Sequence, residues 1–239
     1  MAMFFEEVDY QKTPLGELVL RRRSSPSVPD DLVYEVTLND EMLMSSTVNE
    51  SERALARLAL DGRRADRPLD VLVGGLGLGH TAAEVLSSPS VRRLEVVELL
   101  RPVIRWHRER LVPLADTLMD DPRCTLVEGD FFEHVGPENS EQYDVILLDI
   151  DHAPDCLLHA RHGDFYRADG LHQLADHLRP DGVFGVWSAW EPPEEFTAAL
   201  QNVFASVHEH EVAFFNPHTD RDDSNWILLA EGPEGGGTA

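Results

Sequence analysis

One segment limits the possible folds of this chain more than any other: an apolar stretch that runs into a glycine-rich loop. Residues 72–80 read Leu-Val-Gly-Gly-Leu-Gly-Leu-Gly-His, which predicts a buried strand, a loop and the start of a helix. Glycine lets a backbone turn sharply and approach a ligand closely, and a helix N-terminus adds partial positive charge. We therefore expect a ligand-binding loop that includes Gly75, Gly77 and Gly79.

Acidic residues stand at the ends of the strands that follow this loop. Glu98 ends the next predicted strand, where a carboxylate can accept hydrogen bonds from ribose hydroxyls. This arrangement occurs in sites for NAD and for S-adenosylmethionine, so it indicates an adenosyl ligand without choosing between them. Asp130 and Asp149 end the third and fourth strands. An acid at 130 can accept the adenine amino group, with Phe131 or Phe132 packed on the ring.

From residue 69 onward, predicted strands alternate with predicted helices, which is typical of a parallel, doubly wound α/β sheet. We expect strands at about 70–74, 94–98, 124–128, 143–149 and 182–188, and helices at about 80–88, 101–112, 168–178 and 193–204. Residues 207–215 and 226–230 predict a closing antiparallel hairpin. This α/β part spans residues 61–230 and is the expected donor-binding domain.

The remaining segments flank that domain. Residues 1–60 predict a small N-terminal β-domain, with strands at 17–20 and 33–38, a possible third at 42–44, and one helix from residue 49. Residues 231–239 are rich in glycine and predict a disordered tail.

The net charge of the chain limits the classes of ligand that it is expected to bind. It has 44 acidic and 20 basic residues and a net charge of −24. Such a surface disfavours a nucleic acid, whose binding depends on Lys and Arg, and favours a small cation. No apolar run is long enough to span a bilayer, and the acidic N-terminus does not resemble a secretory signal. With only Cys124 and Cys156, we expect a cytoplasmic protein without a metal site.

Several blocks in order along the chain resemble the spermidine synthase (polyamine aminopropyltransferase) family. The similarity extends from about residue 10 to residue 230. Its blocks are residues 10–16, 75–85, 97–98, 121–123, 128–130, 143–146, 165–166, 178–182 and 187–188. The resemblance implies a Rossmann-like, seven-stranded class I methyltransferase fold with a small N-terminal β-domain. It also implies a homodimer or homotetramer.

The same resemblance implies roles for individual residues. Glu98 would hold the ribose of S-adenosylmethionine or its decarboxylated form, and Asp130 the adenine. Asp149 aligns with the aspartate that assists deprotonation of the attacking amine. Asp151 and Asp155 would extend an acidic mouth suited to a cationic amine.

Two aromatic residues, one at the end of the fifth strand and one just after it, suggest one wall of the acceptor site. Trp187 and Trp190 could contact a cationic substrate through cation–π attraction of about 0.5–2 kcal/mol.

The chain also departs from the family pattern. Leu78 stands where the family's glycine loop carries an aspartate that pairs with the donor amine. His152 takes the place of a second aspartate after Asp149. The stretch 50–56 lacks the tyrosine and histidine that face the acceptor amine in the family.

Three functions remain open from the sequence. The first is aminopropyl transfer from the decarboxylated donor to a small amine. The second is methyl transfer from intact S-adenosylmethionine, which Leu78 favours. The third is ligand binding without catalysis. An NAD dehydrogenase is disfavoured because no set of hydride-transfer residues is evident.

Overall fold

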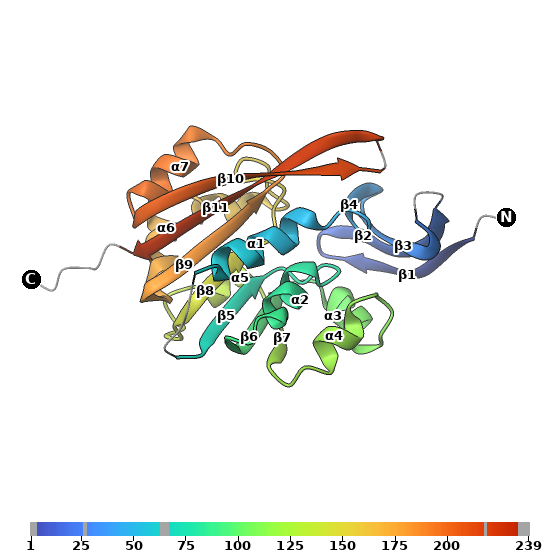
Figure 1. Ribbon diagram of the computed structural model, residues 1–239, viewed down its shortest axis with the longest axis horizontal. Helices are drawn as coiled ribbons and strands as arrows, with labels where there is room; N and C mark the ends of the chain where they lie inside the picture. Colours follow the sequence, from blue (N-terminus) through green and yellow to red (C-terminus); the bar gives the residue numbers. More distant parts are fainter. Residues whose placement is uncertain (1–3, 26–27, 63–66, 218, 234–239) are drawn as a thin grey trace, which may run out of the picture.

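The computed structural model describes residues 4–25, 28–62, 67–217 and 219–233. Within these residues the chain forms two sheets that lie side by side (Figure 1). The smaller one is an antiparallel meander of β1 (Phe5–Thr13), β2 (Gly16–Ser25), β3 (Val28–Leu38) and β4 (Glu41–Ser45). The strand β1 was not expected from the sequence, because its many polar residues show no regular apolar alternation.

The larger sheet has the order β10-β11-β9-β8-β5-β6-β7. Its strands are β5 (Leu69–Gly74), β6 (Val91–Glu98), β7 (Cys124–Glu128), β8 (Tyr143–Leu148), β9 (Leu178–Ser188), β10 (Phe204–Asn216) and β11 (Arg221–Pro233). The neighbouring strands β7, β6, β5, β8 and β9 run parallel. Beyond β9, the strands β11 and β10 continue the sheet as the predicted antiparallel hairpin. The predicted α/β fold with seven strands and a small N-terminal β-sheet is confirmed.

The order of the strands reverses between β5 and β8. Going along the chain from β5, the sheet first grows toward β6 and β7, and then resumes on the other side of β5 at β8. Such a switch point opens a crevice beyond the carboxyl ends of the two central strands. The glycine loop follows β5 directly and therefore borders this crevice.

Helices cover both faces of the larger sheet. They are α1 (Glu50–Leu60), α2 (His80–Ser87), α3 (Arg101–Arg108), α4 (Ala115–Met119), α5 (Phe131–His134), α6 (Ala168–Asp176) and α7 (Glu194–Gln201), with a 3-10 turn η1 at Ala160–Asp164.

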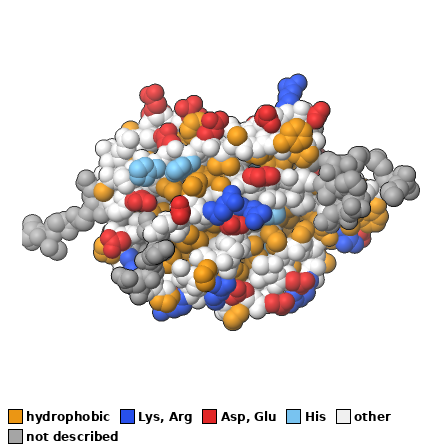
Figure 2. All heavy atoms as spheres, in the orientation of Figure 1, with side chains coloured by type: hydrophobic (Ala, Val, Ile, Leu, Met, Phe, Trp, Pro, Cys, Tyr) orange, Lys and Arg blue, Asp and Glu red, His pale blue; other side chains and the backbone are white. Residues whose placement is uncertain are grey.

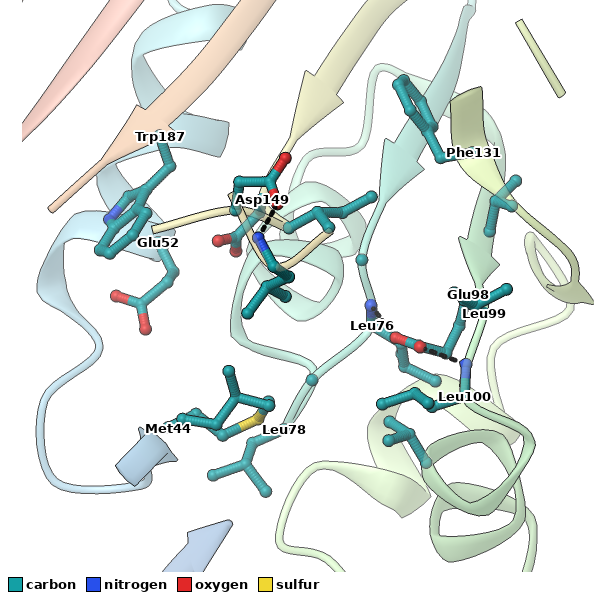
Figure 3. A pocket seen from close by; sticks show the side chains of 18 of the residues that line it. Met44, Glu52, Leu76, Leu78, Glu98, Leu99, Leu100, Phe131, Asp149 and Trp187 are labelled. Atoms are coloured by element: carbon teal, nitrogen blue, oxygen red, sulfur yellow. Dashed lines mark hydrogen bonds between the residues drawn. The ribbon is translucent and has the colours of Figure 1, made fainter. Parts of the chain in front are cut away.

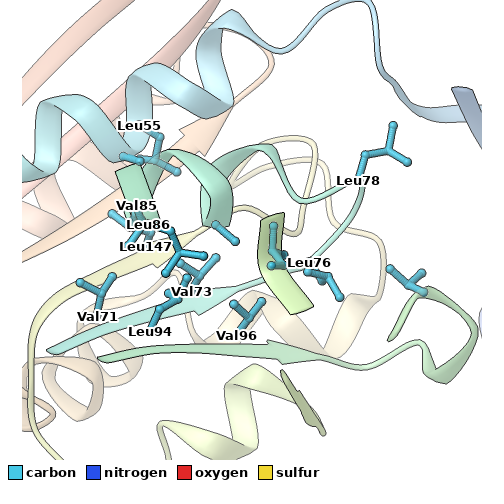
Figure 4. Close-up of a cluster of buried hydrophobic side chains, with 14 of the residues drawn as sticks. Leu55, Val71, Val73, Leu76, Leu78, Val85, Leu86, Leu94, Val96 and Leu147 are labelled. Atoms are coloured by element: carbon cyan, nitrogen blue, oxygen red, sulfur yellow. The ribbon is translucent and has the colours of Figure 1, made fainter. Parts of the chain in front are cut away.

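The larger sheet has a hydrophobic core on each face, and alternate residues of each buried strand point into one core or the other. Val71 and Val73 of β5 pack with residues of α1 to α4, as Figure 4 shows for part of this cluster, whereas Leu72 packs with α5 to α7. Full burial on both faces accounts for the continuous apolar runs in the sequence.

The structure differs from the predicted segment boundaries at two places, the helix α1 and the C-terminal end of β11. The helix α1 was predicted as part of the N-terminal segment. It packs against the strands β9 and β11 of the larger sheet and against the helix α2. The predicted tail begins too early, because β11 continues through Pro233, where Glu231 pairs with Ser206 and Pro233 with Phe204. Residues 234–239 lie outside the described part of the chain.

The described surface carries interspersed acidic and basic side chains on the face shown in Figure 2. None of the described helices combines the length and apolar character needed to span a bilayer.

Candidate active site

A cleft opens at the carboxyl ends of β5, β6 and β8, and encloses about 1110 Å³ including its mouth (Figure 3). The glycine loop forms its floor. The first turn of α1, the strand β4 and Trp187 of β9 close it on the side of the small sheet. The cleft therefore lies at the switch point, where ligands of open α/β sheets bind.

The glycine loop adopts a backbone that other residues rarely tolerate. The φ angles of Gly75, Gly77 and Gly79 are +94°, +50° and +93°. A Cβ at Gly75 would overlap the carbonyl oxygen of Asp149, so the loop lies directly against the end of β8. All three predicted glycines line the cleft.

Glu98 is buried at the end of β6, with its carboxylate turned toward the glycine loop. The N–H of Leu76 donates to its Oε2 at 3.0 Å, and the N–H of Leu100 donates to its Oε1 at 2.7 Å. Burial raises the pKa of Glu98, and these backbone N–H groups offset only part of the rise. A carboxylate has about four acceptor positions, so each oxygen keeps capacity for a ribose hydroxyl.

Asp130 lies at the start of α5, beside the predicted adenine pocket. The N–H of Phe132 donates to its Oδ1 at 2.9 Å, and Arg161 forms an ion pair with its Oδ2 at 2.5 Å. Phe131 is buried against Gly74, whose missing Cβ leaves room for the ring. Asp130, Phe131 and Phe132 all line the cleft.

Asp149 follows β8, and its carboxylate faces the cleft. The Thr81 hydroxyl, on α2, donates to Asp149 Oδ2 at 2.7 Å. Burial raises the pKa of Asp149 to about 6, against the lowering effect of this hydrogen bond. A carboxylate that titrates near neutrality is suited to accept a proton from an amine.

Glu52 faces the same part of the cleft from the first turn of α1 (Figure 3). It was not among the site residues predicted from the sequence. Burial raises the pKa of Glu52 to about 7, and the charge of Asp149 adds to the rise. The hydroxyl of Ser51 lies 2.9 Å from Glu52 Oε2. Acids are common at helix N-termini because the helix dipole favours them, so no sequence signal distinguished Glu52 from its exposed neighbour Glu50.

Asp151 lines the cleft, but protein donors already surround its carboxylate. The N–H of Leu158 and the ring Nδ1 of His162 lie 2.7 Å and 3.0 Å from Oδ1, and the Tyr166 hydroxyl donates to Oδ2 at 2.9 Å. Asp151 therefore holds the loop that includes His162 and Leu158, which also line the cleft.

The two predicted tryptophans lie in different places. Trp187 lines the cleft, and its indole N–H donates to the Ser51 hydroxyl at 2.9 Å. Trp190 is 45% exposed, and its indole N–H donates to Asp155 at 3.2 Å. Neither Trp190 nor Asp155 lines the cleft. His152, the other departure in this loop, does line it.

The remaining wall between the two sheets is apolar. It is formed by Leu15, Leu43 and Met44 of the N-terminal sheet and by Leu78 of the glycine loop. Leu78 is buried and belongs to the hydrophobic core, so it presents no charge to a ligand.

Comparisons with a family model and with curated proteins point to the same family. The model of the spermine/spermidine synthase domain matches residues 48–216. The chain is 36% identical over 155 residues to polyamine aminopropyltransferase 2 of Pseudomonas aeruginosa, covering 61% of this chain and 42% of that protein. It is 34% identical over 142 residues to putrescine N-methyltransferase 2 of Nicotiana attenuata, covering 57% and 37%. The chain thus spans less than half the length of these curated relatives.

Solved structures show the same fold. A spermidine synthase in complex with the transition-state analogue AdoDATO superposes with a TM-score of 0.72 at 21% identity, covering 94% of this chain and 73% of the other. The spermidine synthase of Thermotoga maritima superposes with a TM-score of 0.70 at 19% identity, covering 94% and 72%.

Proposed function

Because this chain belongs to the spermine/spermidine synthase domain family, we propose that it transfers an aminopropyl group from decarboxylated S-adenosylmethionine to a small cationic amine. The choice of donor depends on the charge of the cleft.

The cleft lining is acidic and carries no fixed positive charge among the described residues. Its charged or titratable side chains are Glu52, His80, Glu98, Asp130, Asp149, Asp151, His152 and His162, without a lysine or arginine. The carboxylate of intact S-adenosylmethionine would meet no cationic partner there, and burying an unpaired charge is costly. The decarboxylated donor carries only positive charge, which the acidic lining attracts. This charge balance is the observation that supports the proposal most.

The roles of the residues follow from their positions. Glu98 accepts the ribose hydroxyls, Asp130 faces the adenine amino group, and Phe131 packs beside the ring. The glycine loop holds the donor close to Asp149. The sulfonium carbon is already electrophilic, so the protein mainly aligns the amine in line with the breaking C–S bond and excludes water.

Asp149 then handles the proton of the acceptor. The amine must lose a proton before its nitrogen lone pair can attack the donor carbon, and Asp149 accepts that proton. The new N–C bond forms as the C–S bond breaks, and the electrons of that bond remain on sulfur. The products are the aminopropylated amine and 5′-methylthioadenosine.

Methyl transfer from intact S-adenosylmethionine is the second candidate. It is supported by the relative named a putrescine N-methyltransferase and by Leu78, which cannot pair with a donor amine. The absence of a cation in the described cleft lining argues against it.

Calorimetry with the two donors tests the choice. We expect the decarboxylated donor to bind at least about tenfold more tightly than intact S-adenosylmethionine, a difference of about 1.4 kcal/mol. Equal or tighter binding of the intact donor would contradict the proposal and favour methyl transfer.

A further inference from the structure

The carboxylates of the cleft are not equivalent. Five of them line it within the described residues: Glu52, Glu98, Asp130, Asp149 and Asp151. Both oxygens of Glu98 accept backbone N–H groups, Asp130 is paired with an arginine, and Asp151 is surrounded by three protein groups. Protein groups therefore already compensate the negative charge of three of the five carboxylates.

Glu52 and Asp149 are the other two, and they are compensated differently. Both carboxylates have hydroxyls as side-chain partners, Ser51 for Glu52 and Thr81 for Asp149. None of the described ion pairs joins either carboxylate to an arginine or lysine. By contrast, Asp70 at the opposite end of β5 is paired with two arginines, at 2.6 Å and 2.9 Å.

The two carboxylates belong to one local arrangement. The Thr81 hydroxyl donates to Asp149 Oδ2 and also lies 3.4 Å from the backbone carbonyl of Glu52. This contact fixes the first turn of α1 against the start of α2. Figure 3 shows Glu52 and Asp149 on the same side of the cleft, with Trp187 beside them.

Near neutral pH, without a cation, the two carboxylates are not both fully charged. Burial raises the pKa of Glu52 to about 7, with the charge of Asp149 adding to the rise, and burial also raises the pKa of Asp149 to about 6. The charge of Glu50 on the same helix also raises the pKa of Glu52, and two histidines, His80 from α2 and His152 from the loop after β8, line the same cleft. His80 adds no positive charge at neutral pH, because burial lowers its pKa to about 4.

We propose that Glu52 is an acceptor-binding residue that acts together with Asp149, and that the pair forms the single ammonium-binding position of this cleft. This inference rests on the proposed function. An arriving ammonium group takes the place of the proton that burial keeps on this pair when the cleft holds no cation, and that proton leaves to water. One of the carboxylates then takes a proton from the ammonium, and the neutral nitrogen attacks the donor carbon.

The inference also defines the class of acceptor. Apart from His80 and His152, the lining on this side of the cleft is apolar or aromatic, with Trp187, Leu43 and Met44. Beyond Glu52 and Asp149, every carboxylate that lines the described cleft is already compensated by protein groups, so none is left to hold a distal ammonium group. The acceptor is therefore a primary amine whose remaining part is aliphatic, and a second amino group is not required.

The test compares two glutamates on the same helix turn. We expect Glu52→Gln to lower the affinity for 1-aminobutane by about 10–100-fold, as expected for losing a charge-assisted hydrogen bond. Affinity for 5′-methylthioadenosine should change by less than about threefold. The control Glu50→Gln, at an exposed position, should change neither. Amine affinity is measured by calorimetry on the full chain saturated with 5′-methylthioadenosine, so the result does not depend on turnover.

The outcomes separate this inference from the proposed function. If Glu52→Gln binds the amine as the Glu50→Gln control does, the ammonium-binding position is refuted, even if aminopropyl transfer is observed. If amine binding is lost only in Glu52→Gln but no donor supports transfer, the position stands and the proposed reaction fails. Should Glu52→Gln not fold, a ¹³C carboxyl titration of the wild-type chain replaces it. One glutamate should then titrate near pH 7 and move to lower pH on addition of 1-aminobutane; a midpoint unaffected by the amine would refute the position.

Discussion

The raised pKa of Glu52 beside Asp149 predicts how the stability of the chain depends on pH. The pKa of Glu52 is about 7 in the folded chain, against an ordinary value of 4.5. The folded state therefore keeps a proton that the unfolded state releases between these values. Stability is highest below pH 4.5 as far as this group is concerned, and it falls as the pH rises through 7.

The size of the effect follows from the same two values. Each unit of pKa difference corresponds to about 1.4 kcal/mol, so the upper limit for Glu52 is about 3 kcal/mol. Part of the side chain faces the open cleft, where solvent screens it, and we expect about 2 kcal/mol. Because the proton belongs to the pair, this figure is not added to a separate one for Asp149.

Urea unfolding of the wild type, Glu52→Gln and Glu50→Gln between pH 5 and pH 8 measures this effect. The wild type should lose about 2 kcal/mol more than Glu52→Gln as the pH rises across this range, since the substitution removes the titrating group. The Glu50→Gln variant should follow the wild type. Parallel curves for the wild type and Glu52→Gln would refute the raised pKa of Glu52.

Four further predictions concern the cleft. Asp149→Asn should lower turnover by about 10²–10⁴-fold and change 5′-methylthioadenosine affinity by less than about threefold; unchanged turnover would reject its role as proton acceptor. Glu98→Ala should weaken 5′-methylthioadenosine binding by about tenfold or more in calorimetry, since it removes the ribose acceptor; unaltered affinity would place the ribose elsewhere. Gly75→Ala should abolish that binding, because its Cβ would overlap the Asp149 carbonyl; wild-type affinity would show that the loop is not held as described. 1-Aminobutane and 1,4-diaminobutane should give kcat/KM values within about fivefold of each other at high salt, where long-range attraction is screened; a strong preference for the diamine would reveal a second ammonium position.

The donor side of the cleft could be predicted from the sequence because it depends on local order along the chain. Glycines directly after a buried strand and an acid at the end of the next one identify the loop and Glu98. Since parallel strands end at the same edge of the sheet, Asp130 and Asp149 are brought to the same cleft.

The acceptor side could not be predicted in the same way because it depends on contacts between distant segments. Glu52 comes from a helix that precedes the larger sheet, and its altered pKa arises only when α1 packs beside the end of β8. Asp151 was expected to face a ligand, but His162 and Tyr166 occupy its oxygens. Asp155 and Trp190 contact each other away from the cleft lining.

The N-terminal sheet shows a similar limit to what the sequence can predict. The pairing of β1 with β2, which places Glu7 opposite Arg21, depends on cross-strand partners rather than on a periodic apolar pattern. Sequence periodicity therefore identified the strands with one buried face and missed the most polar one.

The most direct test of the proposed reaction is product analysis by mass spectrometry. The full chain is incubated with 1-aminobutane and either decarboxylated or intact S-adenosylmethionine. We predict equal amounts of N-aminopropylated amine and 5′-methylthioadenosine from the decarboxylated donor, and no product from the intact donor. Methylated amine from the intact donor, or no amine product from either donor, would contradict aminopropyl transfer in this cleft.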